Sequence, residues 1–130
     1  MFALANMADG YVAVTGGYID SKSQYLFSSH RYNVSADTWE DLPNMNVHRE
    51  GHASCFLANR LYVFCGVNAS KEPCNVVEYL DNATGNVSGN SWAQLQLDAS
   101  VLAPRWLSAA TPLNDTEIAI IGGLGIDEDI

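Results

Sequence analysis

Basic residues are scarce in this 130-residue chain, where six lysines and arginines stand against fifteen aspartates and glutamates, giving a formal net charge of −9. Non-specific binding to nucleic-acid phosphates or to anionic lipid surfaces requires clustered cations, so this balance argues against both kinds of partner. Long apolar runs are also missing, because none approaches the ~20 residues that a membrane-spanning helix needs. We therefore expect no nucleic-acid partner and no membrane partner.

Cysteine is rare as well. Cys55, Cys65 and Cys74 are odd in number and have no C-x-x-C spacing. Such cysteines fit small apolar side chains in a reducing compartment. The first residues, MFALANMADG, lack the basic region and the continuous apolar core of a secretory signal peptide. We therefore expect a cytoplasmic protein.

Five Asn-X-Ser/Thr triplets leave a second location open. Asparagine, serine and threonine are common turn residues, so a loop-rich β protein collects such triplets without any modification. The same triplets are acceptors for N-glycosylation, which indicates an extracellular or secretory protein as the alternative. The triplets begin at Asn33, Asn68, Asn82, Asn86 and Asn114.

The chain contains a repeated apolar segment that halts at a glycine pair, or at Cys-Gly in the middle copy. The copies recur about every 50 residues, a spacing typical of β-propeller blades rather than of the shorter helical solenoid repeats. No stretch shows sustained 3.6-residue periodicity, so we expect almost no helix. The copies are Tyr11–Gly17, Leu61–Gly66 and Glu117–Gly123.

Each complete unit is expected to hold four short strands. The first unit covers residues 1–45, the second 46–100, and the third, 101–130, supplies only the first two strands. The strands expected in the first unit are Phe2–Leu4, Tyr11–Gly17, a segment near Phe27–Val34, and Thr38–Leu42. Those of the second are His52–Ala58, the run that ends at Cys65-Gly66, Asn75–Leu80 and Trp92–Leu97. Those of the third are Trp106–Ala110 and Glu117–Gly123.

The ordered set of marked residues in these units resembles the kelch repeat. Kelch marks are a glycine pair ending the second strand, a Tyr in the third, a Trp opening the fourth, and an Arg before the next inner strand. The segment Trp39–Met45 (WEDLPNM) also resembles the end of many kelch blades. The matching residues are, in order, Gly16, Gly17, Tyr32, Trp39, Arg49, Gly66, Tyr79, Trp92, Arg105, Gly122 and Gly123.

This resemblance implies an all-β fold, a partial kelch-type β-propeller of four-stranded antiparallel blades with two nearly complete blades plus half of a third. Kelch propellers usually close a ring of several blades, so the chain is expected to be a fragment that needs further kelch repeats. The Tyr and Trp rings are expected to fill the space between blades, since each buries ~150–250 Å².

No pattern indicates a catalytic residue, a cofactor or a metal. His48 and His52 are four residues apart but have no third ligand near them. Cys55 lacks a positioned base, because His52 would lie on the opposite face of the same strand. The segment Gly122–Gly125 (GGLG) has neither the lysine nor the helix of a phosphate loop, and the acidic segment Asp127–Asp129 fits a solvated loop.

We therefore interpret the chain as a non-enzymatic protein–protein interaction module that presents propeller loops to a protein or peptide partner. The resemblance implies a role such as substrate adaptor or cytoskeletal scaffold. An enzyme of the oxidase or sugar-epimerase type and a secreted glycoprotein domain remain the alternatives. Arg49 and Arg105 occupy the repeat's own Arg slot and are expected to bond neighbouring backbone. The candidate partner contacts are Tyr18, Asp20, Lys22, Tyr25, His48, Glu50, Lys71, Glu72 and Trp106.

Overall fold

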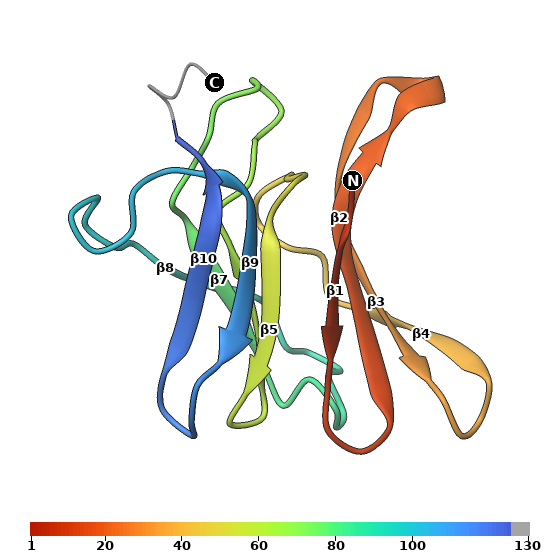
Figure 1. Ribbon diagram of the computed structural model, residues 1–130. Coiled ribbons are helices and arrows are strands. Elements are labelled where there is room, and N and C mark those ends of the chain that lie inside the picture. Colours follow the sequence, from red (N-terminus) through yellow and green to blue (C-terminus); the bar gives the residue numbers. More distant parts are fainter. Residues whose placement is uncertain (126–130) are drawn as a thin grey trace.

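The computed structural model describes residues 1–125 as ten strands in three antiparallel sheets (Figure 1). The first sheet contains β1 (Ala3–Asn6), β2 (Tyr11–Ile19), β3 (Gln24–Asn33) and β4 (Thr38–Leu42). The second contains β5 (Ala53–Leu57), β6 (Arg60–Phe64), β7 (Val77–Asp81) and β8 (Ala93–Leu95). The third contains β9 (Trp106–Pro112) and β10 (Ile118–Leu124). The acidic segment Asp127–Asp129 and the end of the third expected unit lie outside the described residues.

The all-β class and the series of two four-stranded sheets and one strand pair are confirmed. Within each sheet the strands follow chain order, so every neighbouring pair is a hairpin-type antiparallel connection. The helical structure among residues 1–125 is limited to the 3₁₀ turn η1 (Asp20–Lys22) at the tip of the β2–β3 hairpin. This agrees with a sequence that has no helical periodicity.

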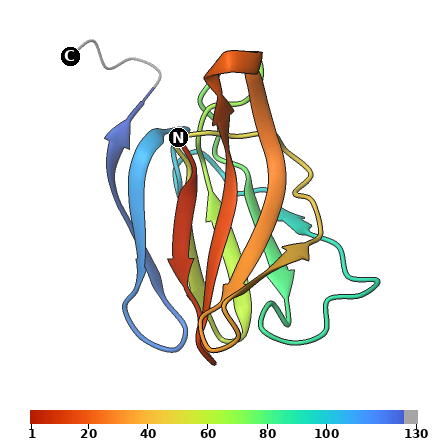
Figure 2. The ribbon, with the colours of Figure 1, turned by 90° about the vertical axis from the view of Figure 1, so that its right-hand side faces the viewer.

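The expectation that the glycine pairs end their strands is wrong for two of the three copies. Strand β2 continues through Gly16-Gly17 to Ile19, and β10 continues through its own pair to Leu124. Only β6 stops before its Cys65-Gly66 pair. The β2–β3 hairpin therefore extends past β1 towards the end where the β6–β7 loop lies, as Figures 1 and 2 both show.

A β-bulge explains why the glycine pair bends β2 instead of ending it. The β2–β3 register shifts between Thr15 and Gly17, because β3 has one more residue than β2 across this interval, and the paired strands bend there. Gly16 has a φ of +57°, and a Cβ at this position would lie 2.6 Å from the backbone oxygen of Arg49. Glycine is therefore required by both conformation and space at this bend.

Two apolar cores hold the sheets together, one on each face of the second sheet. The inner strands β1, β5 and β9 run side by side with β5 in the middle (Figure 1). The core between the first and second sheets contains Ala5, Met7, Ala13, Leu42, Met45, Leu61, Val63, Leu80, Ala83 and Trp92. The core on the other face of the second sheet contains Ala53, Cys55, Phe64, Cys65, Val77 and Leu102, with Ala110, Ile118 and Ile120 packed against it.

Equivalent backbone bonds show which residues of the two full sheets correspond. The amide of Gly17 donates to the carbonyl oxygen of Arg49 at 2.9 Å, and the amide of Gly66 donates to that of Arg105 at 2.9 Å. Each of these glycines thus bonds to the repeat arginine that leads into the next sheet. Gly17 and Gly66 are structural equivalents, and so are Arg49 and Arg105.

The same alignment corrects the equivalence of the two repeat tyrosines. Counting back from the equivalent glycines pairs Val12 with Leu61. Tyr32 lies opposite Val12, whereas Leu80 lies opposite Leu61. Tyr32 therefore corresponds to Leu80, and Tyr79 lies one position earlier on the other face of its sheet, because side chains alternate along a strand.

The two repeat tryptophans are equivalent in register but differ in burial. Trp92, one residue before β8, is 4% exposed, and its Nε1–H donates to the carbonyl oxygen of Pro43, directly after β4, at 2.6 Å. Trp39 on β4 lies opposite Tyr32 and is 62% exposed. The expected packing between blades thus holds for Trp92, because a preceding sheet is present. Trp39 faces the side of the first sheet on which none of residues 1–125 packs as a preceding sheet.

Arg49 ties the first sheet to the second. Its Nη1 donates to the carbonyl oxygens of Cys65 at 2.8 Å and Val76 at 2.9 Å. Its Nη2 donates to Glu78 Oε2 at 2.7 Å, and both side chains are 0% exposed. A buried charge pair of this kind is retained only when its geometry is good, since each ion loses its hydration. Arg49 thereby fixes the segment that enters the second sheet.

Candidate binding cleft

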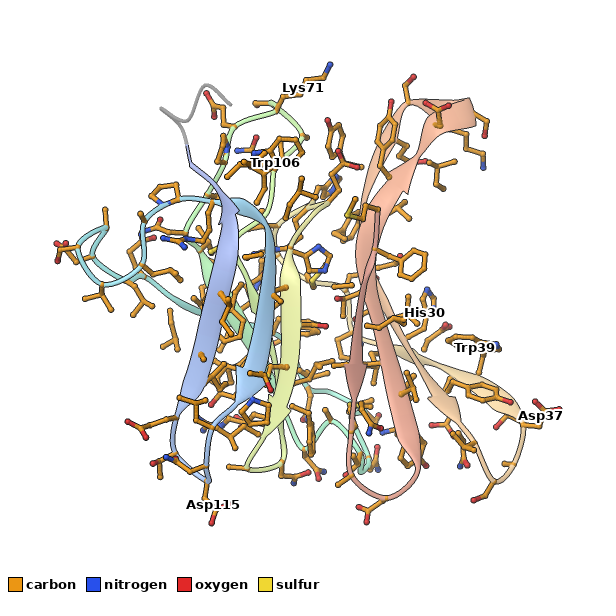
Figure 3. The ribbon with its side chains drawn as sticks, in the orientation of Figure 1. His30, Asp37, Trp39, Lys71, Trp106 and Asp115 are labelled. Atoms are coloured by element: carbon orange, nitrogen blue, oxygen red, sulfur yellow. The ribbon has the colours of Figure 1, made fainter. Side chains whose placement is uncertain are left out.

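A cleft of about 400 Å³ opens where the hairpin and loops of the three sheets meet. Figure 3 shows Lys71 and Trp106 together at this end of the molecule and Asp115 at the opposite end. The lining comes from the first sheet, from the segment that enters the second sheet, from the β6–β7 loop and from the start of the third sheet. We call it the loop-end cleft, and its lining residues are Tyr18, Tyr25, Glu50, Val67, Lys71, Pro73 and Trp106.

Five of the nine candidate contact residues therefore come together in one place, although they span the chain from residue 18 to residue 106. Their contact with a partner stays a prediction. The residues that the structure brings together are Tyr18, Tyr25, Glu50, Lys71 and Trp106.

Tyr18 and Tyr25 form one wall of the loop-end cleft. They are direct cross-strand partners on β2 and β3, and their ring centroids lie 4.9 Å apart at an interplanar angle of 56°. The sequence predicts both on a loop, but they lie on strands because β2 continues past its glycine pair. Strand pairing fixes both backbones, so the two rings are held in place more firmly than loop residues are.

The backbone of Glu50 is held by two hydrogen bonds to Val67. Its amide donates to Val67 O at 3.1 Å, and its carbonyl oxygen accepts from the Val67 amide at 2.9 Å. The Glu50 side chain is 22% exposed, and its Oε2 lies 3.4 Å from the amino nitrogen of Met1, whose side chain is 65% exposed. The carboxylate is therefore accessible from the cleft and has only a loose cationic contact.

Trp106 occupies the same position in the repeat as Glu50, directly after the equivalent arginine. The amide of Arg105 donates to Cys74 O at 3.3 Å, and its Nη1 donates to Gly122 O at 3.1 Å. These bonds join the start of β9 to both the second and the third sheets. In each repeat, an arginine anchors the backbone and the next residue reaches the loop-end cleft.

The turn after Gly66 is shaped by one asparagine side chain. Asn68 Oδ1 accepts hydrogen bonds from the amides of Ser70 at 2.9 Å and Glu72 at 3.1 Å. The Lys71 amide also donates to Asn68 O at 2.9 Å. This turn holds the Lys71 backbone at a φ of +62°, where a non-glycine residue is uncommon. The loop that carries Lys71 is therefore a defined turn.

The other four candidate contact residues lie outside the cleft. Asp20 and Lys22 are exposed in the turn η1 at the hairpin tip, and Glu72 is exposed on the Asn68 turn. His48 stacks on Phe27 with ring centroids 4.3 Å apart. It also lines a depression between the β4–β5 connection and the β6–β7 loop.

Sequence reasoning missed Val67 and Pro73, which line the apolar part of the cleft. They bridge each other in antiparallel fashion, and Val67 also bridges Glu50. Their position directly after a repeat glycine is the signal that could have found them. Val67 is buried beneath the cleft, so it limits the depth to which a ligand can enter.

The cysteines do not form a reactive site. The three cysteines are free thiols, and burial raises the pKa of Cys55 and raises that of Cys65 to about 11. Thiols with such raised pKa values are poor nucleophiles at neutral pH. Among residues 1–125, no group of three or more His, Cys, Asp or Glu side chains could hold a metal ion. Within the same residues, no helix has the length and apolar character needed to cross a membrane.

His52 is a buried histidine that connects the first two sheets. Its Nε2 lies 2.8 Å from Thr15 Oγ1, and its Nδ1 has no partner among the described residues. The Thr15 hydroxyl on β2 is therefore the hydrogen-bond partner that the structure provides for this side chain. Burial, together with the nearby charge of Arg49, lowers the pKa of His52 to about 3. The imidazole is therefore neutral in the folded protein.

This neutral histidine predicts a loss of stability as the pH falls. A histidine in the unfolded chain has a pKa near 6.5. Between about pH 6.5 and pH 3, His52 is therefore protonated in the unfolded state and neutral in the folded state. The free energy of unfolding should fall below pH 6.5 with a slope approaching about 1.4 kcal/mol per pH unit. Urea unfolding at pH 7.5, 6.5 and 5.5 measures this slope. The slope should be reduced in His52→Gln, and an unchanged slope in that variant would contradict the assignment.

Comparison with known proteins adds to this geometry. A family model described as the kelch motif matches residues 5–46. These residues contain all four strands of the first sheet except the start of β1, and they include the bend at Gly16-Gly17. The first sheet therefore carries a kelch motif. The three sheets of the chain have the strand content of two kelch blades and the inner half of a third.

A curated relative supports the kelch assignment over a longer part of the chain. Kelch-like protein 15 of Gallus gallus is 27% identical over 81 residues, which cover 58% of this chain and 17% of the relative. The chain therefore matches only a small part of that relative's length. Kelch repeats are typically protein-binding modules, and the loop-end cleft lies at the loop side of these blades.

Proposed function

We propose that this kelch-motif protein is a non-enzymatic protein-binding module whose loop-end cleft holds a segment of a protein or peptide partner. The observation that carries the proposal is the convergence of Tyr18, Tyr25 and Trp106 with two charged side chains in one cleft. Aromatic residues dominate the energetics of many interfaces because they bury large areas with few rotatable bonds. Binding residues also concentrate where loops are held by a rigid scaffold.

The extents of the blades are part of the same proposal. In this proposal residues 1–45 and 46–100 are two blades, residues 101–130 supply the first two strands of a third, and further kelch repeats close the ring. Two exposed apolar side chains support this: Trp39 on the outer face of the first sheet is 62% exposed, and Ile121 on the third is 60% exposed. Repeat units bury such faces only by stacking on neighbours.

Within this function, we propose a role as a substrate adaptor or a cytoskeletal scaffold in the cytoplasm. The kelch resemblance supports the role, and the acidic balance of the chain disfavours phosphate-rich partners. Each role requires a partner to be held at the loop side while another part of the assembly is engaged elsewhere.

Substitution of one wall of the cleft tests the proposed function. Trp106→Ala should lower the recovery of captured partners from a cell lysate at least about tenfold, because a central aromatic contact is typically worth 2 kcal/mol or more. Asp115→Ala, at the opposite end of the molecule, should leave recovery unchanged (Figure 3). Quantitative mass spectrometry of the captured proteins measures both. Equal recovery with wild type and Trp106→Ala would remove the cleft from the proposal.

A further inference from the structure

We propose that the loop-end cleft binds an arginine side chain of the partner, a proposal that rests on the proposed function and specifies its ligand. The cleft combines three aromatic rings, from Tyr18, Tyr25 and Trp106, with the Glu50 carboxylate. A guanidinium group can stack on an aromatic face and donate hydrogen bonds to a carboxylate at the same time. A lysine ammonium carries the same charge but is not planar, so it cannot stack on a ring face in this way.

The chain already uses this combination twice within its own sheets. Arg31 Cζ lies 4.8 Å from the centroid of the Tyr11 ring, and its Nε donates to Glu40 at 2.6 Å. In the second sheet, Arg60 Cζ lies 4.5 Å from the centroid of the Tyr79 ring.

Arg60 also bonds to a carboxylate, as Arg31 does. Arg60 Nε donates to Asp81 Oδ1 at 2.5 Å, while the guanidinium covers the Tyr79 ring. Both internal sets therefore contain a tyrosine ring, a carboxylate and a guanidinium. The loop-end cleft has rings and a carboxylate but no lining arginine, so in this proposal the partner supplies the guanidinium.

The charges at the cleft favour a cation over an anion. The Glu50 side chain is 22% exposed and lies in the cleft wall, where its charge is less screened than on the open surface. Lys71 is the cation that lines the cleft, and it is exposed at the rim, where water and salt screen its charge. The net charge of −9 also speeds the approach of a basic segment.

The existing contact of Glu50 with the Met1 amino group is weak enough for a partner's guanidinium to replace it. The Met1 amino nitrogen lies 3.4 Å from Glu50 Oε2, and Met1 is exposed, so the two groups make a long ion pair at the surface. Exposed ion pairs of this kind are weak, because water and salt screen the two charges. A guanidinium that stacks between rings gains contact area that this amino group does not have, so it displaces the amino group.

Selection from a random peptide library displayed on phage tests the proposal with defined probes. The immobilised 130-residue protein should enrich peptides that share an arginine, and the Trp106→Ala protein should not. Enrichment of peptides without a shared arginine that still depends on Trp106 would overturn the arginine proposal while supporting the proposed function. If the wild-type protein enriches no peptides beyond background, or if Trp106→Ala enriches the same peptides equally well, both proposals fail.

Synthetic versions of an enriched peptide give the sharper measurement. Replacing its arginine by citrulline, which keeps the shape and removes the charge, should weaken the affinity measured by calorimetry about tenfold. Replacing it by lysine should weaken the affinity less than citrulline does, because the cation remains while planar stacking is lost. Equal affinity of the arginine and citrulline peptides would overturn the proposal.

Two isosteric variants separate specific binding from general attraction to an acidic protein. Glu50→Gln should weaken the arginine peptide about tenfold and remove its advantage over citrulline. Glu72→Gln makes the same change in net charge on the neighbouring turn, outside the cleft lining, and should change the affinity less than twofold. Equal effects of the two variants would show that only net charge matters and would contradict the proposal. Both substitutions replace side chains that reach solvent, so the fold is expected to persist, and circular dichroism checks this.

Discussion

Replacing Arg49 by leucine should lower the free energy of unfolding by about 3–5 kcal/mol, because the substitution leaves the Glu78 carboxylate buried without its partner. Both side chains are 0% exposed and are joined by a 2.7 Å hydrogen bond. The carbonyl oxygens of Cys65 and Val76 would also lose their side-chain donor. Equilibrium urea unfolding monitored by tryptophan fluorescence measures the loss.

Two control variants distinguish this pair from a general loss of packing. Arg105→Leu removes the equivalent arginine, which is partly exposed and has no carboxylate partner among residues 1–125, so it should cost about 1 kcal/mol or less. The double variant Arg49→Leu with Glu78→Leu should be more stable than Arg49→Leu alone, since the unpaired buried charge is gone. A double variant less stable than the single one would contradict the account.

The Arg49→Leu substitution should also disturb the loop-end cleft. Glu50 follows Arg49 directly, and the backbone of this segment is bonded to Val67. A less firmly held Arg49 segment would therefore release the carboxylate that we propose as the arginine acceptor. The arginine occupies a structural slot of the repeat, and the residue after it is free to vary between blades, as Glu50 and Trp106 show.

Much of this fold could be predicted because each strand depends on local sequence. The apolar runs before the glycine pairs became β2, β6 and β10, and the Thr38–Leu42 segment became β4 with the expected bounds. Apolar and β-branched content between turn residues is sufficient to specify such strands. The kelch marks then fixed the order of the sheets.

The parts that could not be predicted depend on register and on contacts between distant residues. Whether a glycine pair ends a strand or bends it depends on pairing with the next strand, so the extension of β2 to Ile19 has no local signal. Tyr32 of the first unit is structurally equivalent to Leu80 of the second, whereas the sequence suggests Tyr79, one residue earlier. A shift of one residue reverses the face of a side chain, so sequence alone could not assign these faces.

The cleft itself was only partly accessible from sequence. Glu50 and Trp106 stood out as non-repeated residues at the entries to inner strands, and Tyr18 and Tyr25 as members of the loop expected after the first glycine pair. Their meeting point depends on how three sheets stack, which no local pattern encodes. Val67 and Pro73 complete the cleft through backbone bridges that form only in the folded protein.

The second large effect concerns the tryptophans, which test whether successive sheets pack as kelch blades. Trp92→Ala should lower the free energy of unfolding by about 3–5 kcal/mol, the usual cost of truncating a buried aromatic side chain. The buried ring packs between the first two sheets, and the substitution also removes the hydrogen bond from its Nε1–H to Pro43 O. The loop-end cleft takes its walls from all three sheets, so it exists only if this packing holds.

Trp39→Ala is the matched control, because Trp39 holds the same position in the first sheet. Its ring is 62% exposed and makes only a tilted contact with Tyr32 at 5.1 Å between centroids. Truncation should therefore cost about 1 kcal/mol or less.

The difference between the unfolding free energies of Trp92→Ala and Trp39→Ala, measured side by side in urea, is the most direct test of the stacked-blade arrangement. We expect the Trp92 variant to be at least about 2 kcal/mol less stable than the Trp39 variant. Equal stabilities, or a larger loss at Trp39, would show that the sheets do not stack in this order and that the cleft does not form as described.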